Sequence, residues 1–422
     1  MKHLLVALML LFGFAGAAAA QGGEPTRNDT NAVVPDRVDP NDAAEYGCLS
    51  CHEGIESIRD PESEMMQQIV SIGHDYGDPG GCVTCHGGNP QGLTAEEAHQ
   101  GAPAELAETG PDMFFPDPGS VWIAEKTCGQ CHSGYGDRLK LALMNTEAGK
   151  LQGNLWSWGV LDTHQSVYGN YTLVDEDGYE PQVGTEAYAE YILAFAEAHP
   201  EQLPLSMEQV PEVDVDAISE HPNLAGITYS RQQCQRCHVG VTGREKRGDY
   251  RGTGCSSCHI PYSNEGFYEG SDPTIPKDQP GKLLTHQMQS SRDTVVTVGD
   301  VSYSGIPSET CNSCHNRGKR IGVSYQGIME FPYGSPYDET GGKQPKLHTK
   351  NYVFIKDDLH HQQASRPENP EGGMLCQDCH TTVDMHGDGN LPGTTLAQVE
   401  IECEDCHGTV SKAPWELPLG YG

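Results

Sequence analysis

The chain has 422 residues, of which 60 are acidic and 26 basic, so its formal net charge at pH 7 is -34. A chain this negative excludes nucleic acid as the default partner and disfavours adsorption to anionic lipid, because both of these carry negative charge themselves. Only 7% of the residues are aromatic, whereas 50 are glycine and 28 are proline. Ordering each residue costs roughly 1.5 kcal/mol of conformational entropy. We therefore expect something other than protein side chains to fill much of the core.

The N-terminus has the features of an export signal. Lys2 and His3 form a short basic start, an apolar run of 11 residues extends from Leu4 to Phe14, and a small-residue stretch ends at Ala20. We expect cleavage there, which makes 1–20 a signal peptide; the alternative is a buried N-terminal helix. The run is too short to span a bilayer. The sequence thus predicts an exported protein, periplasmic or extracellular at the cell surface, without a transmembrane segment in the mature chain.

All 16 cysteines belong to one pattern, Cys-x-x-Cys-His, which occurs eight times. Numbered first to eighth in chain order, the copies are Cys48/Cys51/His52, Cys82/Cys85/His86, Cys128/Cys131/His132, Cys234/Cys237/His238, Cys255/Cys258/His259, Cys311/Cys314/His315, Cys376/Cys379/His380 and Cys403/Cys406/His407. The pattern is typical of covalent haem attachment, in which two thiols bond to the porphyrin and the adjacent histidine is the proximal iron ligand. Zinc sites, a disulfide framework or thioredoxin-like pairs would leave the eight histidines unexplained. The motifs predict eight covalently bound haem c groups.

With these motifs, which extend from Cys48 to His407, the sequence resembles the octahaem c-type cytochromes of the multihaem cytochrome c family. The resemblance implies closely packed haems wrapped by irregular polypeptide. We expect an irregular, loop-rich fold with a few short helices and minimal strand, and with the haem chain as its core. Each haem brings a flat apolar surface larger than that of an aromatic side chain. We therefore expect the chain without haem not to fold.

Ten further histidines are available as distal ligands once the eight motif histidines and His3 are set aside. An iron with two histidine ligands is six-coordinate and has no open position for a substrate. Eight of the ten are predicted ligands: His74, His99, His199, His286, His348, His360, His361 and His386. His164 and His221 are the weakest candidates. Met374 and Met385 are alternative axial ligands, although methionine more often fills gaps in a core.

The spacing of the motifs predicts three segments in the mature chain. An N-terminal lobe with three haems covers 21–150, a haem-free insert rich in aromatic residues covers 151–225, and a C-terminal lobe with five haems covers 226–422. The first and second motifs are close in sequence, as are the fourth and fifth and the seventh and eighth, so their haems are expected to be neighbours.

Few regular elements are expected. A helix is predicted from Pro61 to Gly73 with Asp60 as its N-cap, followed by His74, and a second helix starts at Thr185 and stops before Pro200. A hairpin is predicted at 177–178 and a short strand within 293–300.

Two functions fit these features. The first is an exported carrier or conduit of electrons, with polymerisation into a haem filament as a variant; its surface carboxylates suit redox partner proteins with basic docking surfaces. The alternative is an octahaem enzyme with one open iron, resembling reductases of tetrathionate or nitrite, or hydroxylamine oxidoreductase. The Cys-x-x-Cys-Lys motif of nitrite reductases is missing, whereas Lys343, Lys346 or Lys350 keeps a lysine ligand of the tetrathionate type open. We favour the non-catalytic reading, in which every haem is low-spin.

Overall fold

The computed structural model describes residues 47–169, 208–211, 213–233, 237–290, 295–298, 301–317, 324–331, 333–334, 337, 340–362, 373–392, 399–411 and 413. All of them belong to one compact unit, Asp39–Gly422. Several predicted features lie outside the described residues: the signal peptide at 1–20, the hairpin at 177–178, the helix from Thr185, the ligand His199, and Cys234 of the fourth motif.

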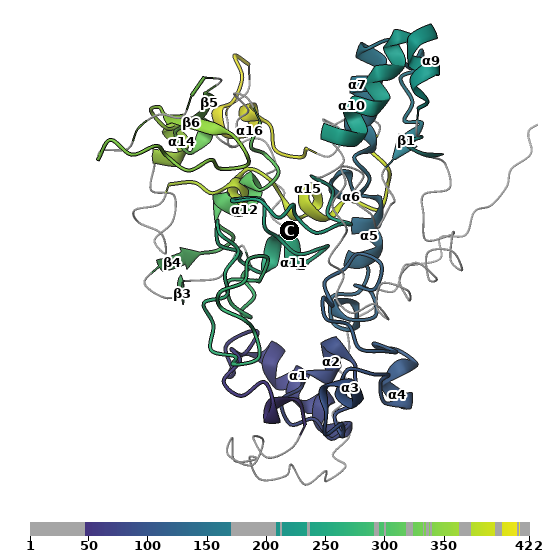
Figure 1. Cartoon of the computed structure of the whole chain (residues 1–422), viewed down its shortest axis with the longest axis vertical. Coiled ribbons are helices and arrows are strands. Elements are labelled where there is room, and N and C mark those ends of the chain that lie inside the picture. The colour runs from purple at the N-terminus through teal and green to yellow at the C-terminus, as the bar shows by residue number, and fades with distance from the viewer. Residues whose placement is uncertain are drawn as a thin grey trace, which may run out of the picture. The chain divides into compact units, whose positions relative to one another are not determined.

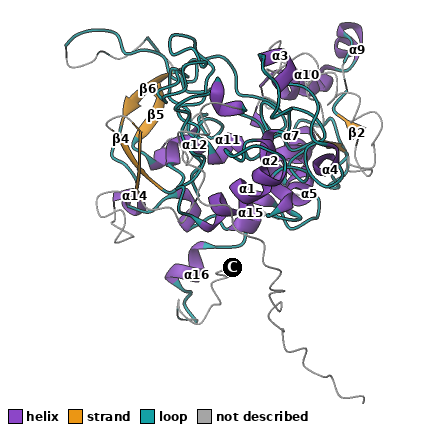
Figure 2. Cartoon of the chain, turned by 90° about the horizontal axis from the view of Figure 1, so that it is seen from below, coloured by secondary structure: helices purple, strands orange, loops and turns teal. Residues whose placement is uncertain are grey.

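Loops make up most of the described chain, with short helices between them (Figure 2). The three longest described helices are α1 (Glu64–Asp75), α7 (Ala148–Ser157) and α10 (Ala225–Gln233). The other helices and single helical turns are η1 (Cys48–Ser50), α2 (Val83–His86), α3 (Ala95–Ala98), α4 (Ala104–Ala107), η2 (Cys128–Gln130), α5 (Tyr135–Leu141), α6 (Leu143–Thr146), α9 (Val215–Glu220), η4 (Pro222–Leu224), α11 (Ser256–His259), α12 (Ser308–Asn312), α14 (Leu359–Gln362), η6 (Cys376–Asp378), α15 (Thr382–His386) and α16 (Cys403–His407). Within the described ranges, no helix has both the length and the apolar character needed to cross a bilayer.

The described strands form three sheets of two strands each. β1 (Tyr168–Gly169) pairs in parallel with β2 (Glu208–Gln209). β3 (Val295–Val298) pairs antiparallel with β4 (Val301–Ser304), and β5 (Ile328–Phe331) pairs antiparallel with β6 (Asn351–Phe354). The expected loop-rich fold with a few short helices and minimal strand is thereby confirmed, and β3 occupies the centre of the strand expected within 293–300.

Helix α1 has other ends than the sequence predicts. It begins at Glu64, because Ser63 provides the N-cap by accepting a hydrogen bond from the backbone N–H of Met66. Asp60 instead closes a preceding turn, where its carboxylate accepts from the N–H of Glu62. The helix also continues past Gly73 to Asp75, so His74 lies in its last turn and not beyond it. The predicted N-cap at Asp60 and the predicted end at Gly73 are therefore wrong.

The apolar core of the described chain is small, and most of it comes from residues before Ile260. One cluster contains Phe115, Val121, Trp122, Ile123, Leu139, Ala142 and Val239. A second cluster, where α7 packs against α10 (Figure 1), contains Leu151, Leu155, Val210 and Ile227. From Ile260 onward only five apolar side chains of the described residues are buried. Side chains alone give the later motifs little apolar surface to pack against.

Buried polar groups are as common as buried apolar ones in the described residues. Twenty-four polar or charged side chains are buried, against 23 hydrophobic ones. Burying a polar group costs free energy unless it is hydrogen-bonded, so much of this interior is held by directional bonds. The buried Thr253 is an example, because its N–H and hydroxyl both donate to the half-buried carboxylate of Asp117, which also accepts from the hydroxyl of Ser256. This carboxylate ties the segment before the third motif to the fifth motif.

Replacing Leu151 by alanine is expected to destabilise the protein by about 2–5 kcal/mol, because the side chain is fully buried between α7 and α10 and its loss leaves a cavity. Leu93→Ala is the matched control, since Leu93 is 86% exposed. Urea unfolding followed by far-ultraviolet circular dichroism measures both. Equal unfolding midpoints for the two variants would contradict a structural core at α7 and α10.

Candidate functional site

The Cys-x-x-Cys-His motifs share one local structure. In six of them the backbone N–H of the histidine donates to the carbonyl of the first cysteine, with N···O distances of 2.8–3.0 Å. This bond closes a single helical turn, as in α2 and α11. The eighth motif forms the short helix α16. The turn brings both thiols and the imidazole of one motif close together. The 15 described cysteines form no disulfide, so their thiols remain available for other bonds.

The motifs differ in how far the surrounding protein covers them. A core built around the motifs would bury their side chains, yet eight of the described motif residues are exposed: Cys51, Cys131, His132, His315, Cys379, Cys403, Cys406 and His407. These exposed residues belong to the first, third, sixth, seventh and eighth copies. In these copies protein side chains alone do not enclose the predicted attachment residues.

The shortness of the motif helices explains this exposure. Cys51, Cys131 and Cys379 are the C-caps of the single turns η1, η2 and η6, and the chain leaves each turn for a loop at that residue. A single turn has no next turn to cover its last side chains. The second cysteine of these three motifs is therefore left at the surface.

The two exposed histidines of the third and sixth motifs have different neighbours. His132 lies edge-on to Tyr135, with ring centroids 6.3 Å apart, and Tyr135 is in turn edge-on to His386 at 4.9 Å. His315 precedes Asn316, which is the buried residue at this turn and donates from its amide to the carbonyl of Asn312 at 3.0 Å. Since Asn316 occupies the inner side of the turn, His315 lies on the outer side.

Four pairs of histidine rings have their ring centroids about 6 Å apart; the ring planes are inclined by 17–35° in three of the pairs and by 77° in His360–His407. Each pair joins one motif histidine to one histidine outside the motifs. The pairs, with the distance between ring centroids, are His52–His99 (6.2 Å), His86–His286 (6.1 Å), His259–His386 (6.1 Å) and His360–His407 (5.8 Å). An imidazole nitrogen binds a transition-metal ion at about 2.0 Å, which puts the centroids of two rings on opposite sides of one ion roughly 6.3 Å apart. The pairs therefore have the spacing of two axial ligands with an ion between them.

Hydrogen bonds at Nδ1 orient most of these rings. Nine described histidines have Nδ1 within 2.6–3.1 Å of a carbonyl or carboxylate oxygen: His52, His86, His259, His286, His348, His360, His361, His380 and His386. These oxygens only accept, so Nδ1 is the donor and a neutral ring has its lone pair on Nε2. A histidine that binds a metal in proteins almost always makes such a bond with its other nitrogen. The hydrogen bonds therefore prepare Nε2 for a ligand role.

Burial keeps several of these rings neutral. Desolvation, followed by the proximity of His286, lowers the pKa of His86 to about 4. Desolvation also lowers the pKa of His386 to about 4, although its hydrogen bond to the carbonyl of Thr382 acts in the opposite direction. The pKa values of His99 and His286 are lowered for the same first reason. A neutral imidazole has the lone pair that a metal ion requires, so these rings need not lose a proton to bind one at neutral pH.

Thiols of different motifs lie close to one another. The Sγ atoms of Cys48 and Cys82 and the carboxylate of Asp78 are all within 4.8 Å of one another. A hydrogen bond to Cys128 and burial together raise the pKa of Cys255 well above its ordinary value. The neighbouring thiols that interact are Cys48 with Cys82, Cys85 with Cys128, Cys128 with Cys255, Cys258 with Cys311, Cys311 with Cys376, and Cys379 with Cys406. The motifs therefore follow one another in space as first, second, third, fifth, sixth, seventh and eighth.

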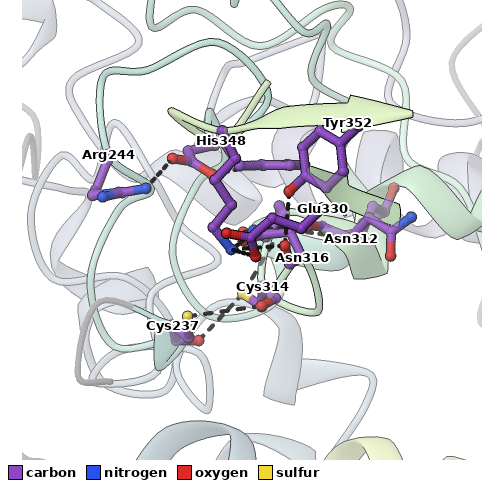
Figure 3. Close-up of polar contacts among 12 residues, drawn as sticks. Cys237, Arg244, Asn312, Cys314, Asn316, Glu330, His348 and Tyr352 are labelled. Carbon is purple, nitrogen blue, oxygen red and sulfur yellow. Dashed lines mark hydrogen bonds and ion pairs between the residues drawn. The ribbon is translucent and has the colours of Figure 1, made fainter. Parts of the chain in front are cut away.

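The fourth motif joins this series from the side, at the sixth. The thiol of Cys314 donates to the carbonyl of Cys237 at 3.4 Å, a contact visible in Figure 3. His238 of the fourth motif is buried, and its Nδ1 has no hydrogen-bond partner. Desolvation, followed by the positive charges of Arg251 and Lys150, lowers the pKa of His238 to about 3. The environment of this histidine is thus cationic, whereas His52 and His380 have carboxylates beside them.

A polar cluster lies beside the fourth and sixth motifs (Figure 3). The carboxylate of Asp249 forms an ion pair with Arg244 at 2.6 Å and accepts from Nδ1 of His348 at 2.7 Å. Beside it, the hydroxyl of Tyr352 donates to the carbonyl of Asn316, the residue that follows the sixth motif, at 2.7 Å. These groups are almost fully buried. The cluster fixes the ring of His348, a predicted ligand, next to the two motifs.

The other predicted ligands have different positions. His361 donates from Nδ1 to Asp357 and has the ring of Tyr325 edge-on to it. His74 is exposed at the end of α1. The weaker candidates are a surface residue, His221, and His164, whose ring lies 4.7 Å from that of Trp156.

Of the lysine and methionine alternatives, Lys350 and Met374 have hydrogen bonds in the structure. Lys350 donates its Nζ to the carbonyl of Asn316 at 2.8 Å and lies 3.4 Å from a carboxylate oxygen of Glu330. The backbone N–H of Met374 donates to the carbonyl of His360. The bonds at Lys350 hold that side chain in a polar network.

Sequence reasoning missed the groups that hold the rings in place. Asp272 contacts His52, and Glu56 contacts His286, across more than two hundred residues of chain. No local pattern signals either pair. The contact between His380 and Asp384 is different, since a spacing of four residues on the short helix α15 places the two side chains together. That spacing could have been read from the sequence.

Comparisons with protein-family models, with curated proteins and with solved structures found no match.

Replacing Asp249 by alanine is expected to destabilise the protein by about 3–5 kcal/mol at pH 7, because it leaves the buried Arg244 without its partner. Burial raises the pKa of Asp249, but the hydrogen bond from His348 and the charge of Arg244 outweigh this and hold its pKa below the ordinary value. The stabilisation is therefore present above pH about 4 and is lost as the pH falls through the folded-state pKa.

Unfolding of the two proteins by urea at pH 7 and at pH 3 checks this pH dependence. Asp278→Ala is the control, because Asp278 is exposed. A destabilisation that is the same at both pH values would exclude the ionised carboxylate as its cause.

Proposed function

We propose that this protein is an exported octahaem c-type cytochrome whose function is to carry electrons. In this proposal each Cys-x-x-Cys-His motif holds one haem through two thioether bonds and one proximal histidine. Haem iron changes between ferric and ferrous, so each bound group would contribute one-electron redox chemistry. The acidic chain, with a net charge of -34, suits docking to redox partners with basic surfaces. Association into a filament remains the variant that the sequence suggests.

The four ring pairs carry this proposal. Every pair combines a motif histidine with a histidine outside the motifs, although nothing in the sequence dictates such a match. Their centroid distances of 5.8–6.2 Å are those of axial ligands on two sides of one ion. A zinc or disulfide role for the cysteines would give no reason for this pairing.

The donor set also fits haem. A backbone hydrogen bond joins the histidine to the first cysteine in six motifs. Six of the eight rings in the four pairs donate from Nδ1 to oxygen, which leaves the lone pair of a neutral ring on Nε2. In this assignment His99, His286, His386 and His360 are the distal ligands of the first, second, fifth and eighth haems. An iron with two histidines has no site for substrate, so these four haems would transfer electrons only.

The small apolar core supports the same conclusion. Only five apolar side chains are buried from Ile260 onward among the described residues, yet this part of the chain contains the sixth, seventh and eighth motifs. Flat porphyrin surfaces would replace side-chain burial there at about 25 cal/mol per Å² of apolar area removed from water. In this proposal they would also cover motif residues that the protein leaves exposed, such as His132 and His315. A chain expressed without haem attachment is accordingly expected to be unfolded and degraded.

The proposal is tested by the mass and the spectrum of the exported protein. Intact-protein mass spectrometry is expected to give the mature chain plus eight haem masses. His286→Ala is expected to convert one low-spin haem to high spin, because it removes the partner of His86. His221→Ala is the control and should leave the electron paramagnetic resonance spectrum unchanged, since His221 is exposed. A colourless protein without added mass would end the proposal, and an unchanged spectrum for His286→Ala would remove His286 from the ligands.

A second candidate function is reduction of a small sulfur or nitrogen substrate at the fourth haem. The observation that favours it is the cationic setting of His238, which lies near Arg251 and Lys150 and stacks with no other histidine among the described residues. Positive groups beside an iron with an open position would favour an oxyanion there.

Titration of the oxidised protein with nitrite, hydroxylamine or cyanide distinguishes the two candidate functions. A conduit with two histidines on every iron gives no spectral change. A high-spin signal that shifts on adding one of these ligands, and that disappears in a His238→Ala variant, would favour the enzyme.

A further inference from the structure

Asp272 is a buried carboxylate that contacts a predicted iron ligand. Its Oδ2 atom accepts a hydrogen bond from Nδ1 of His52 at 2.6 Å, and its side chain is 0% exposed. The hydroxyl of Thr274 donates to its other oxygen at 2.7 Å. This carboxylate lies on a loop after the fifth motif but serves the histidine of the first, so the two ends of the contact are brought together only by folding.

The partner of Nδ1 differs between the paired motif histidines. His86 donates to the backbone carbonyl of Phe115 and His259 to that of Gln289, both at 2.7 Å. Those acceptors are neutral, whereas Asp272 is ionised at neutral pH. In the pair at the eighth motif, His360 donates to Asp358, but this carboxylate is 46% exposed and solvent screens its charge. Within the four ring pairs, the contact at His52 is therefore the one that combines a charged acceptor with full burial; outside them, His380 has the buried carboxylate of Asp384 at 3.1 Å.

We propose that Asp272 is a positioning residue that sets the reduction potential of the first haem below that of the second and fifth; this inference rests on the proposed function. A carboxylate bound to Nδ1–H makes the imidazole a stronger electron donor to the iron. The negative charge also stabilises ferric over ferrous iron, and burial strengthens that effect because the effective dielectric constant is low. Both effects act in the same direction and lower the potential.

A hydrogen-bond network holds Asp272 in place for this role. The phenol of Tyr268 accepts from the backbone N–H of Asp272 at 3.1 Å and donates to the carboxylate of Glu56 at 2.8 Å. Glu56 in turn accepts from the backbone N–H of His286, and its carbonyl accepts from Nδ1 of that ring. One network thus orients a ligand of the first haem and a ligand of the second. The charge of Asp272 also reaches His286, so the second haem is expected to respond in the same sense but less.

The test is a potentiometric titration of the intact holoprotein, with haem methyl signals followed by nuclear magnetic resonance. The signals of the first haem are those that change in a His99→Ala variant, because His99 is the partner of His52. Asp272→Asn removes the charge and keeps the shape. At a fixed applied potential, the ferrous-to-ferric ratio of the first haem is expected to rise by on the order of tenfold, which corresponds to a reduction potential about 59 mV higher for one electron. The low-spin spectrum is expected to be retained.

Thr274→Val gives an independent variant of opposite sign. Thr274 is exposed, so its replacement should not prevent folding. Its hydroxyl donates to Asp272 and also lies 3.0 Å from Nδ1 of His52. Without that hydroxyl, the carboxylate of Asp272 has one donor fewer and becomes a stronger acceptor for His52. The N–H at Nδ1 of His52 also loses the neutral hydroxyl oxygen as an alternative acceptor. Both changes are expected to lower the potential of the first haem. Asp60→Asn is the control, because it removes one negative charge shortly after the first motif, at an exposed residue whose carboxylate accepts from the backbone N–H of Glu62.

The outcomes separate this inference from the proposed function. Opposite shifts in Asp272→Asn and Thr274→Val, without a shift in Asp60→Asn, support it. If neither variant shifts the potential of the first haem, the inference about Asp272 is overturned and the haem assignment is unaffected. An equal shift in Asp60→Asn would have the same meaning. If Asp272→Asn does not fold, the sign of the shift in Thr274→Val decides. A protein without haem signals would overturn the proposed function itself.

Discussion

The arrangement of this protein depends on imidazole rings that lie in pairs about 6 Å apart, most of them held by hydrogen bonds from Nδ1 to oxygen. A ring pair separated by about 6 Å in a folded chain has no packing reason of its own, because the two rings do not touch. The distance between the centroids is that expected for two imidazoles bound on opposite sides of one metal ion. The hydrogen bonds fix the tautomer and the direction of six of the eight rings before any ligand binds. Together they support the proposal that these histidines are ligands of iron.

Distant parts of the chain are interlocked through the same histidines. The segment around Tyr268 and Asp272, after the fifth motif, contacts His52 and Glu56 near the first, and further along it His286 faces His86 of the second. The described residues correspondingly belong to one compact unit. The predicted division into a lobe of three haems and a lobe of five remains a prediction, but hydrogen bonds cross the proposed boundary at each of these residues.

The interior matches this organisation. Charged groups such as Asp249, Arg244 and Asp272 are buried, and each has a partner of opposite charge or a hydrogen-bonded imidazole. Buried ions of this kind add little net stability compared with apolar packing, so their retention suits a site whose electrostatics have a function. The contrast between the carboxylate beside His52 and the cations beside His238 means that the irons held there would experience different fields. Differences in the local electric field help to set the relative reduction potentials in a chain of redox groups.

The sequence by itself determined the eight motifs, the histidines within them and the loop-rich character of the fold, because these follow from local spacing and composition. It also named the histidines outside the motifs that the structure places about 6 Å from motif histidines, since His99, His286, His360 and His386 were among the predicted ligands. Only the tertiary structure decided which of these histidines lies near which motif and which motif residues stay exposed. It also decided that the fourth motif contacts the sixth, and that Asp272 and Glu56 orient rings more than two hundred residues away. The reason is physical: pairing across a gap depends on how distant loops pack, and in a chain with so few regular elements no periodicity records that packing.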